Sequence, residues 1–442
     1  MLSHSYSSSS MLKPLIPKFI TFILNRLKNA GHQAYIVGGA VRDVCLSRPV
    51  MDWDVSTSAR REEIKTLFGD IRLFALKQGT VTLVDSGRHF EVTPFRGSKK
   101  RIEDDLALRD FTINAMAYDS DKDEILDPFG GRKDISCKLV KTTGGSETRF
   151  KEDPLRMLRA VRLAAELGFT IDAGTKDKMT EMALMLRLVS PERIREELMK
   201  ILMSPRPSKG FNILQRTGLL RYSLPELLEG YLKRQNSHHR YTIFKHVMET
   251  VDTVKPSPTM RLTALLHDIA KPRLRKKIDG TWRFYKHEVA SASLAEKVMR
   301  RLRFSRDMII KVTNLIRYHM IGYDSGWSDG AVRRLIRRVG HGQIMDLITF
   351  RQADLLAHGL HNQNDNLLTE LKERIEKLRE EQIVTTTHDL AISGHKVVEV
   401  LGISPGPNVG KILKELLEKV TDNPALNTEK DLIATLLSME TT

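Results

Sequence analysis

Cysteine is nearly absent from this sequence, with Cys45 and Cys137 the two examples among 442 residues. Two thiols cannot form the disulfide framework that stabilises small secreted domains, so that class is excluded and a cytoplasmic location is expected. Long apolar runs are also absent, and no run reaches the ~20 residues that a membrane-spanning helix needs. The opening MLSHSYSSSS lacks the features of a signal peptide. We expect it to be disordered, and Met11 is an alternative start.

Acidic residues are in deficit, with 55 against 71 basic residues and a formal charge of +16. Such an excess favours an anionic partner, and nucleic acid is the usual one. A membrane surface is the alternative, but no lysine-rich amphipathic helix stands alone. The length is too great for one hydrophobic core, so two to four domains are expected.

A short apolar run broken by two glycines begins the first recognisable motif, AYIVGGAVRDV (34–44). The pattern predicts a strand, a tight turn at Gly38 and Gly39, and a helix over 41–46. Glycine lets backbone amides approach a ligand, and amides at a helix start favour phosphate. Arg42 would add a charged donor to such a phosphate. A strand–turn–helix without a ligand is the alternative.

Two aspartates follow in the segment VMDWDVST (50–57), which alternates as a strand does. Residues two apart on a strand share a face, so Asp52 and Asp54 are expected to point the same way. Carboxylates that close repel unless a divalent cation lies between them. Glu91, on the second strand of a hairpin predicted over 79–96, is a candidate third carboxylate. A solvent-exposed polar edge is the alternative for all three.

These residues resemble a known family, the class II nucleotidyltransferases, which comprise the tRNA CCA-adding enzymes and the bacterial poly(A) polymerases. The resemblance extends over 34–235 through four further segments in the family's order. These segments are EDDLALRDFTINAMAYD (103–119), EILDPFGGRKDI (124–135), EDPLRMLRAVRLAAELGF (152–169) and SPERIREELMKIL (190–202).

The resemblance implies a reaction and a set of roles. A 3′-hydroxyl attacks the α-phosphate of a nucleoside triphosphate, with Mg²⁺ held by the two aspartates. Gly38, Gly39 and Arg42 would bind the triphosphate. Arg109 would contact the triphosphate or the sugar, and a salt bridge to Asp110 or another nearby acid is its alternative role.

The segment 152–165 is expected to be a helix that selects the base. Asp153 and Arg156 would then share a helical face and match the hydrogen-bonding edges of cytosine and adenine, whereas guanine and uracil present the reversed pattern. Arg159 and Arg162 continue near that face and would meet phosphate or this base-selecting pair. A helix start with an acidic cap is the alternative.

One departure from the family concerns the segment GSKKRI (97–102), which has six residues where CCA-adding members carry a much longer flexible loop. That loop is associated with the switch from cytidine to adenosine addition. The short segment resembles the CC-adding members, so the sequence predicts addition of two cytidines to tRNA from CTP. Full CCA addition, using ATP as well, and poly(A) synthesis are the alternatives.

Histidines and aspartates in the second half resemble the pattern of HD-superfamily phosphohydrolases. His246, the adjacent pair His267 and Asp268, and the distant Asp354 would surround one transition metal. His287 and His319 are candidates for substrate binding or a second metal. A purely helical scaffold is the alternative.

The predicted fold is therefore α+β, with a small mixed β-sheet nucleotidyltransferase head followed by an all-helical neck, HD body and tail. A basic helical surface would hold the acceptor arm of tRNA by charge and shape. An HD phosphohydrolase with a nucleotide-binding head, or a non-enzymatic RNA-binding protein, fits the carboxylates less well. The expected ranges are an N-terminal extension and lead-in helix (1–29), head (30–145), neck and RNA-binding region (146–235), HD domain (236–375) and helical tail (376–442).

Overall fold

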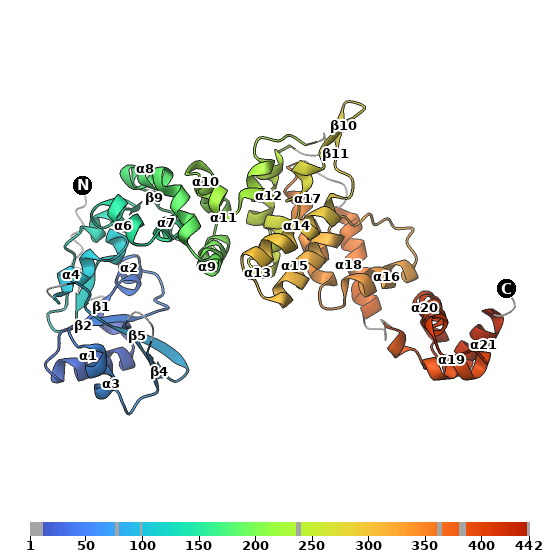
Figure 1. Ribbon diagram of the computed structural model, residues 1–442, viewed down its shortest axis with the longest axis horizontal. Coiled ribbons are helices and arrows are strands. Elements are labelled where there is room, and N and C mark those ends of the chain that lie inside the picture. The colour runs from blue at the N-terminus through green and yellow to red at the C-terminus, as the bar shows by residue number, and fades with distance from the viewer. Residues whose placement is uncertain are drawn as a thin grey trace. The chain divides into compact units, whose positions relative to one another are not determined.

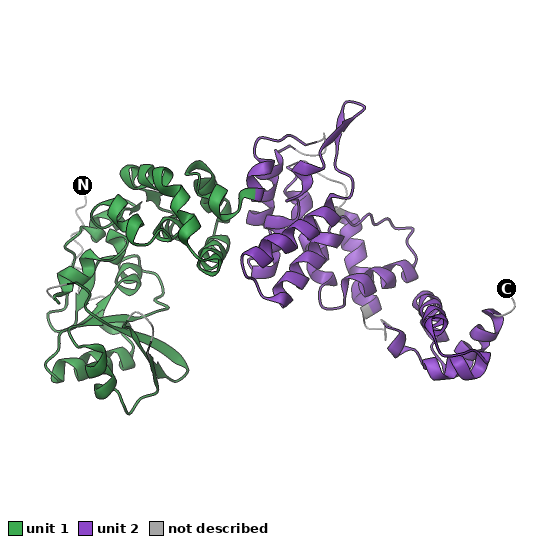
Figure 2. Ribbon diagram, viewed as in Figure 1, with its two compact units in different colours: residues 1–225 green, residues 226–442 purple. Residues whose placement is uncertain are grey.

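The computed structural model describes residues 12–75, 79–97, 100–235, 240–359, 365–379 and 386–439. The chain divides into two compact units, 1–225 and 226–442 (Figure 2). The division falls in the short 3-10 helix η5 (Pro225–Gly230). The predictions of an unstructured opening segment and of a start at Met11 concern residues outside the described part. The predicted domain boundaries stay predictions.

The first unit begins with a seven-stranded sheet in the order β3-β4-β5-β2-β1-β6-β7 (Figure 1). The central pair β2 and β5 is parallel, and the other neighbours are antiparallel. The predicted mixed sheet is therefore confirmed. The strands are β1 (Ala34–Val37), β2 (Asp54–Thr57), β3 (Leu73–Ala75), β4 (Val81–Asp85), β5 (Arg88–Pro94), β6 (Ala117–Asp119) and β7 (Glu124–Leu126).

Helices pack on this sheet through apolar residues at helical spacing. In α1 (Lys18–Asn29), Ile20, Ile23, Leu24 and Leu27 are buried, and the helix contacts β1 and β2. Such spacing gives one apolar stripe along a helix. The remaining head helices are α2 (Gly39–Cys45), α3 (Arg61–Leu67), α4 (Ile102–Ala107), α5 (Gly131–Ser136), and the 3-10 turns η2 (Lys13–Leu15) and η3 (Thr112–Asn114).

Two turns position the site residues. Strand β1 ends at Val37, Gly38 adopts φ +75°, and α2 starts at Gly39. A positive φ is easily reached by glycine and rarely by other residues. The hairpin β4–β5 turns through Ser86 and Gly87, which both have positive φ, as a tight hairpin requires. The predicted strand–turn–helix and hairpin are both present.

The predicted continuous helix over 152–165 is wrong. Helix α6 (Ser146–Glu152) ends before Asp153, which is extended with φ −152°, and α7 starts at Arg156 and runs to Leu167. Pro154 explains the break, because proline disfavours the helical conformation in the residue before it. The rest of this unit comprises β8 (Leu139–Val140), β9 (Thr170–Ile171), α8 (Ala173–Met182), η4 (Ala183–Leu188), α9 (Pro191–Leu202), α10 (Pro207–Arg216) and α11 (Leu220–Ser223).

The second unit is a helical assembly with one small hairpin, β10 (Lys276–Ile278) with β11 (Thr281–Arg283). The parallel pair β8–β9 and this hairpin are the described strands outside the seven-stranded sheet, so the remainder after the head is mainly helical, as predicted. In the described ranges, each helix is too short or too polar to cross a membrane.

Helices of the second unit pack both against the next helix in the sequence and against distant ones. For example, α12 contacts α13 and α17. Its helices are α12 (Ile243–Thr253), α13 (Pro258–Leu266), η6 (Lys271–Arg273), α14 (His287–Arg301), α15 (Arg306–Tyr318), α16 (Asp329–Val339), α17 (Ile344–Leu356), α18 (Asp365–Arg379), η7 (Thr387–Asp389), α19 (Gly394–Leu401), α20 (Pro407–Asp422), η8 (Pro424–Leu426) and α21 (Glu429–Met439).

Candidate active sites

Carboxylates gather at the N-terminal end of β2. Asp54 is the first residue of that strand and pairs in register with Val37 of β1 and with Glu91 of β5. Register partners on neighbouring strands project from the same face, so Glu91 lies beside Asp54. Asp52 is exposed just ahead of the strand, and the intervening Trp53 is buried. The strand begins only at Asp54, so Asp52 lies ahead of it, and Val55, Ser56 and Thr57 are all buried.

The electrostatics of Asp54 show how crowded this site is. Burial, followed by the neighbouring charge of Glu91, raises the pKa of Asp54 to about 6, and Asp52 adds to the effect. Arg109 opposes the shift without cancelling it. Carboxylates that destabilise one another's charge fit a divalent cation, and Mg²⁺ prefers such oxygen ligands. The residues at this site therefore suit Mg²⁺.

Arg109 lies directly against the glycine turn. A Cβ atom added to Gly38 would be 2.7 Å from Arg109 Nη1 and 3.7 Å from Asp54 Oδ2. The guanidinium Nη2 donates to Ser56 Oγ at 3.3 Å and to the fully buried Asp105 at 3.4 Å. The alternative role predicted for Arg109 was a salt bridge to Asp110 or another nearby acid, and the acid that it meets in the structure is Asp105. The absence of a side chain at Gly38 is what admits Arg109 to the site.

Arg42 lies over Gly39 but is held by protein groups. Its Nη1 donates to Asn114 Oδ1 at 2.6 Å, and its Nε and Nη2 donate to Asp43 at 2.9 and 3.0 Å. Gly39 is its neighbour, because a Cβ there would be 3.5 Å from Arg42 Nη2. These contacts fix the guanidinium beside the start of α2, where an anion would meet it.

The predicted base-selecting pair does not share a helix. Asp153 lies on the turn before α7, where it accepts from Leu155 N at 3.1 Å and forms an ion pair with Arg193 of α9 at 2.7 Å. Arg156 opens α7 and is paired with Glu152 at 2.5 Å. The main-chain amide of Arg156 donates to Asp153 O at 3.1 Å, so a turn, not a helical face, brings the two together.

The next two arginines of α7 are in ion pairs. Arg159 pairs with the buried Asp110 at 2.6 Å, and Arg162 pairs with Glu197 at 2.8 Å. Their predicted contacts with phosphate or with the base-selecting pair stay predictions.

The sequence did not predict the residues that hold Asp153, Arg109 and Arg42 in place, which are Arg193, Asp105 and Asn114. Arg193 lies inside the recognised segment 190–202, and Asp105 and Asn114 lie inside 103–119, but nothing local indicated their contacts.

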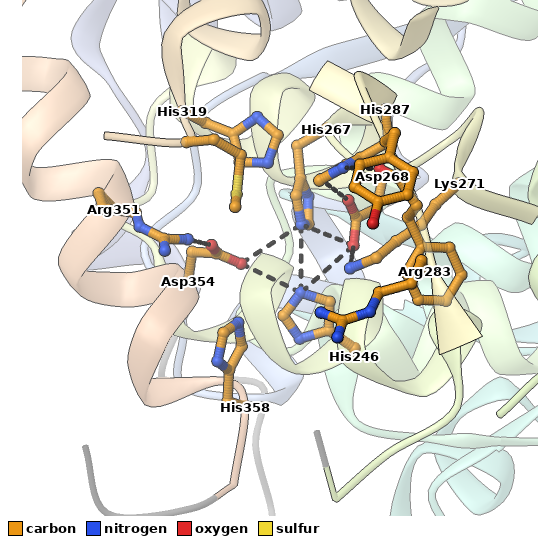
Figure 3. A pocket seen from close by; sticks show the side chains of 13 residues that line it. His246, His267, Asp268, Lys271, Arg283, His287, His319, Arg351, Asp354 and His358 are labelled. Carbon is orange, nitrogen blue, oxygen red and sulfur yellow. Dashed lines mark hydrogen bonds and ion pairs between the residues drawn. The ribbon is translucent and has the colours of Figure 1, made fainter. Parts of the chain in front are cut away.

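In the second unit, four predicted residues from three helices converge (Figure 3). His246 lies on α12, His267 and Asp268 follow α13, and Asp354 lies on α17. His246 Nε2, His267 Nε2 and Asp354 Oδ1 are separated pairwise by 3.0, 3.2 and 3.3 Å. All four residues are buried.

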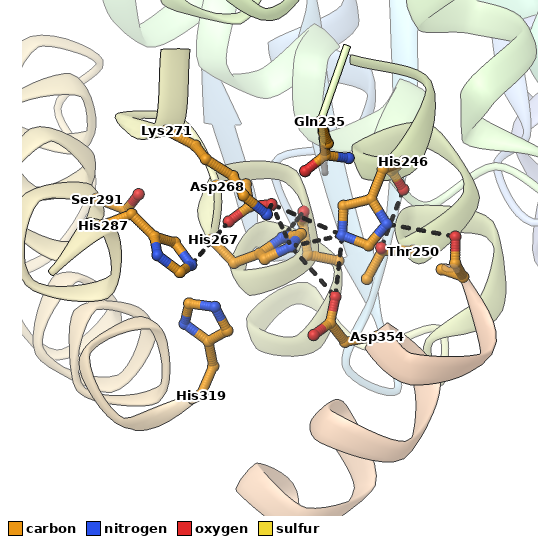
Figure 4. A network of polar contacts seen from close by, with 12 residues as sticks. Gln235, His246, Thr250, His267, Asp268, Lys271, His287, Ser291, His319 and Asp354 are labelled. Atoms are coloured by element: carbon orange, nitrogen blue, oxygen red, sulfur yellow. Dashed lines mark hydrogen bonds and ion pairs between the residues drawn. The ribbon is translucent and has the colours of Figure 1, made fainter. Parts of the chain in front are cut away.

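The opposite ring nitrogens of these histidines already have partners, as Figure 4 shows for His246. His246 Nδ1 lies 3.3 Å from Ala357 O, and His267 Nδ1 lies 2.9 Å from Ala264 O. A carbonyl oxygen accepts hydrogen bonds and donates none, so each Nδ1 carries a hydrogen and a ring in its neutral form presents the Nε2 lone pair to the cluster. This is the usual arrangement of metal-binding histidine.

His287 and His319 form a second group with Asp268, and these three residues have ligand atoms close enough to hold one ion. His287 Nε2 lies 3.4 Å from Asp268 Oδ1. Both rings repeat the tautomer pattern, with His287 Nδ1 2.9 Å from Phe284 O and His319 Nδ1 2.7 Å from Ile316 O. Burial lowers the pKa of His319 to about 3, so its ring is neutral at pH 7.

These groups line a cavity of about 210 Å³, and basic side chains line it as well. Lys271 Nζ lies 2.8 Å from Asp268 Oδ2, and Arg351 Nη1 lies 2.5 Å from Asp354 Oδ2. Burial raises the pKa of both aspartates, but these cations and the surrounding histidines outweigh it, so both pKa values lie well below the ordinary range. Arg283 and Tyr285 also line the cavity.

Three family models match the chain. They are described as the poly A polymerase head domain (34–141), the "Probable RNA and SrmB- binding site of polymerase A" (168–230) and domain 2 of tRNA nucleotidyltransferase (279–436). The first ends at the point where the head helices give way to α6, and together the three cover most of both units.

Curated relatives and solved structures agree with these matches. The CCA-adding enzyme of Streptococcus thermophilus is 28% identical, covering 95% of this chain and 96% of the relative. That of Geobacillus stearothermophilus is 40% identical over 46% of this chain and 54% of the relative. The crystal structure of the Bacillus stearothermophilus CCA-adding enzyme in complex with CTP has a TM-score of 0.73 at 26% identity, covering 95% and 96% of the two chains.

Binding of Mg²⁺ should depend on pH through Asp54. Its pKa of about 6 means that the carboxylate is protonated below that pH, and a proton then competes with the cation. Mg²⁺ affinity measured by calorimetry should be level above about pH 7 and fall by about tenfold per pH unit below the pKa. Glu91→Gln should move the midpoint to lower pH, because it removes a raising charge. Unchanged affinity down to pH 5 would contradict the assignment.

Proposed function

We propose that this chain, as a member of the tRNA nucleotidyltransferase and poly(A) polymerase family, completes the CCA end of tRNA from CTP and ATP. The proposal rests on the cluster of three carboxylates, those of Asp52, Asp54 and Glu91, next to the glycine turn. The names of the relatives support CCA addition over poly(A) synthesis.

Residues of the head would position the groups that react. The triphosphate would lie along Gly38 and Gly39, with Arg42 and Arg109 donating to its oxygens. Asp52 and Asp54 would hold Mg²⁺, which supplies positive charge for displacement at the α-phosphate. Glu91 is proposed as a third carboxylate that keeps this end of the sheet negative. The tRNA 3′-hydroxyl attacks the α-phosphate and pyrophosphate leaves.

Base choice is assigned to the turn that joins α6 to α7. The Asp153 carboxylate can accept from the exocyclic amine of cytosine or adenine, and Arg156 can donate to the neighbouring ring acceptor. Uracil and guanine reverse this pattern, which leaves polar groups unpaired. The ion pair from Arg193 would hold Asp153 in the orientation that this reading requires. Arg159 and Arg162 would act behind the pair.

Addition of CC alone is the second candidate, and one structural feature favours it. Arg96 Nε donates to Asp105 Oδ1 at 2.7 Å, and Asp105 in turn holds Arg109. This contact ties the end of β5 to α4 across the short segment 97–102, of which Ser98 and Lys99 lie outside the described residues. Arg96 and Asp105, on either side of this segment, are therefore held together, which favours one arrangement of the site over a switch between two. The relatives favour CCA nonetheless.

The remaining proposals concern binding and location. The acceptor arm of tRNA would be held by backbone charge along 146–235, a range that contains the matched RNA-binding model at 168–230. We also propose the domain boundaries that the sequence predicted: a head at 30–145, an HD domain at 236–375 and a tail at 376–442. A cytoplasmic location is proposed as well.

The proposed function is tested by the products formed on tRNA that lacks its CCA end. We expect two cytidines from CTP alone, a complete CCA end from CTP with ATP, and no addition from ATP alone. A product that stops at CC with both nucleotides would establish the second candidate.

Asp54→Asn should lower the rate of addition by at least about 100-fold, because it removes a charge that acts on the reacting phosphate. The exposed head variant Asp70→Asn is the matched control and should keep the wild-type rate. Near-normal addition by Asp54→Asn would overturn the assignment of the site.

Base selection is tested separately. Arg156→Ala should lower the ratio of kcat/KM for CTP over UTP by at least about 100-fold, since a hydrogen-bonding site discriminates through groups left unpaired by the wrong base. Arg216→Ala, an exposed arginine at the end of α10, is the control. A ratio that Arg156→Ala leaves unchanged would mean that another residue reads the base.

A further inference from the structure

The hairpin formed by β10 and β11 projects from the helices of the second unit (Figure 1). We propose that this hairpin is an RNA-binding arm, which holds the sugar-phosphate backbone of the tRNA substrate through basic side chains on both of its faces. The identity of the RNA rests on the proposed function. The arm adds a contact in the second unit, outside the range 146–235 proposed to hold the acceptor arm.

Basic residues are concentrated in this hairpin and at its ends. The segment RKKIDGTWRFYK (275–286) contains five basic residues and one acidic residue, Asp279 in the turn. Among the described residues, no carboxylate forms an ion pair with the four exposed cations. Exposed charge of one sign without compensation attracts a polyanion, and RNA is the polyanion of the proposed function. The four exposed cations are Lys276, Lys277, Arg283 and Lys286.

The register of the hairpin places two of these cations directly opposite each other. Lys276 of β10 pairs with Arg283 of β11. Residues paired in this way project from the same face with Cβ atoms about 4.5–5.5 Å apart, and like charges at such positions destabilise a hairpin. A hairpin that served only the fold would be more stable with a neutral residue at one of the two positions. A phosphate group between the side chains would replace this repulsion with two attractive contacts.

The other face of the hairpin holds an arginine in a form that suits phosphate. Lys277 pairs with Trp282, and the guanidinium carbon of Arg275 lies 3.4 Å from the centroid of the Trp282 ring. At this distance the planar guanidinium must lie flat on the indole, because any other orientation would bring its nitrogens into the ring. A guanidinium ordered in this way loses less freedom when it donates to a phosphate. Arg275 and Lys277 therefore offer a second pair of phosphate donors.

These side chains are suited to the backbone of RNA and not to its sequence. The major groove of an A-form helix is too narrow for side chains to read the bases, whereas the phosphates are accessible from outside. Contacts between cations and phosphates add affinity without selecting a sequence. The arm should therefore strengthen the binding of tRNA and leave the transfer reaction in the head unchanged.

The test compares the wild-type chain with a full-length variant carrying Lys276→Ala and Lys277→Ala. Arg283 stays unchanged, because it also lines the histidine and aspartate cavity. The affinity for a tRNA transcript that lacks its CCA end is measured by fluorescence anisotropy over a range of salt concentrations. Loss of two phosphate contacts should weaken binding by about tenfold at physiological salt and reduce the slope of log K against log salt by about 1.5. In the addition assay, KM for tRNA should rise by a similar factor while kcat stays the same.

The matched control removes the same charge from another part of the second unit. Lys297 on α14 and Lys311 on α15 are both exposed, and the double variant Lys297→Ala and Lys311→Ala should bind tRNA as the wild type does. Equal weakening in this control would mean that total charge alone matters, and it would overturn the arm. Lysine on an exposed strand also prevents edge-to-edge pairing, and that role alone would leave the affinity of the hairpin variant unchanged. Unchanged affinity, or a lower kcat with an unchanged KM, would therefore overturn the arm as well.

Anisotropy measures binding without catalysis, so the arm and the proposed function can fail separately. A chain that binds tRNA but adds no nucleotide would refute the proposed function, and the hairpin variant would still decide on the arm. A wild-type chain that does not bind tRNA would overturn both. If the alanine pair lowers Tm in thermal unfolding, the pair Lys276→Gln and Lys277→Gln, which keeps long polar side chains, takes its place with the same expected results.

Discussion

The head is organised around one unfavourable interaction, the burial of Asp54 beside Glu91. The parallel pairing of β2 with β5 forces these carboxylates onto one face, and the raised pKa of Asp54 records the cost. Arg109, which lies against Gly38, reduces that cost through its positive charge, and Asp105 holds Arg109 in place. Replacement of any one of these groups would disturb the others, because they share a single buried electrostatic balance.

The second unit applies the same physics with different ligands. There, lone pairs of histidine nitrogens and aspartate oxygens face one another, and their far sides are fixed by backbone carbonyls. The head offers hard carboxylate oxygens alone, which suit Mg²⁺, whereas the second unit offers imidazole as well.

Sequence patterns predicted the local features well, because their causes are local. The turn at Gly38 and the hairpin through Gly87 each depend on a few adjacent residues. The helix over 152–165 was mispredicted because the resemblance implied a continuous helix, whereas Pro154 disfavours the helical conformation at Asp153. The hairpin β10–β11 was not predicted from its short, exposed strands.

Long-range partners could not be predicted from the sequence. Arg193 meets Asp153 from 40 positions away, and Asp105 joins Arg96 to Arg109 only after β5 and α4 have packed together. His287 and His319 were recognised as candidates, but their division from the first metal group depends on the two oxygens of Asp268. Such contacts are properties of the folded chain.

The carboxylates at β2 are proposed to form an ion-binding site next to a triphosphate. The most direct measurement is the anomalous difference map of a crystal soaked with Mn²⁺ and CTP. We expect anomalous density within coordination distance of Asp52 and Asp54, with the triphosphate along the turn at Gly38 and Gly39. CTP bound at that turn with no ion at Asp54, or bound elsewhere, would contradict it.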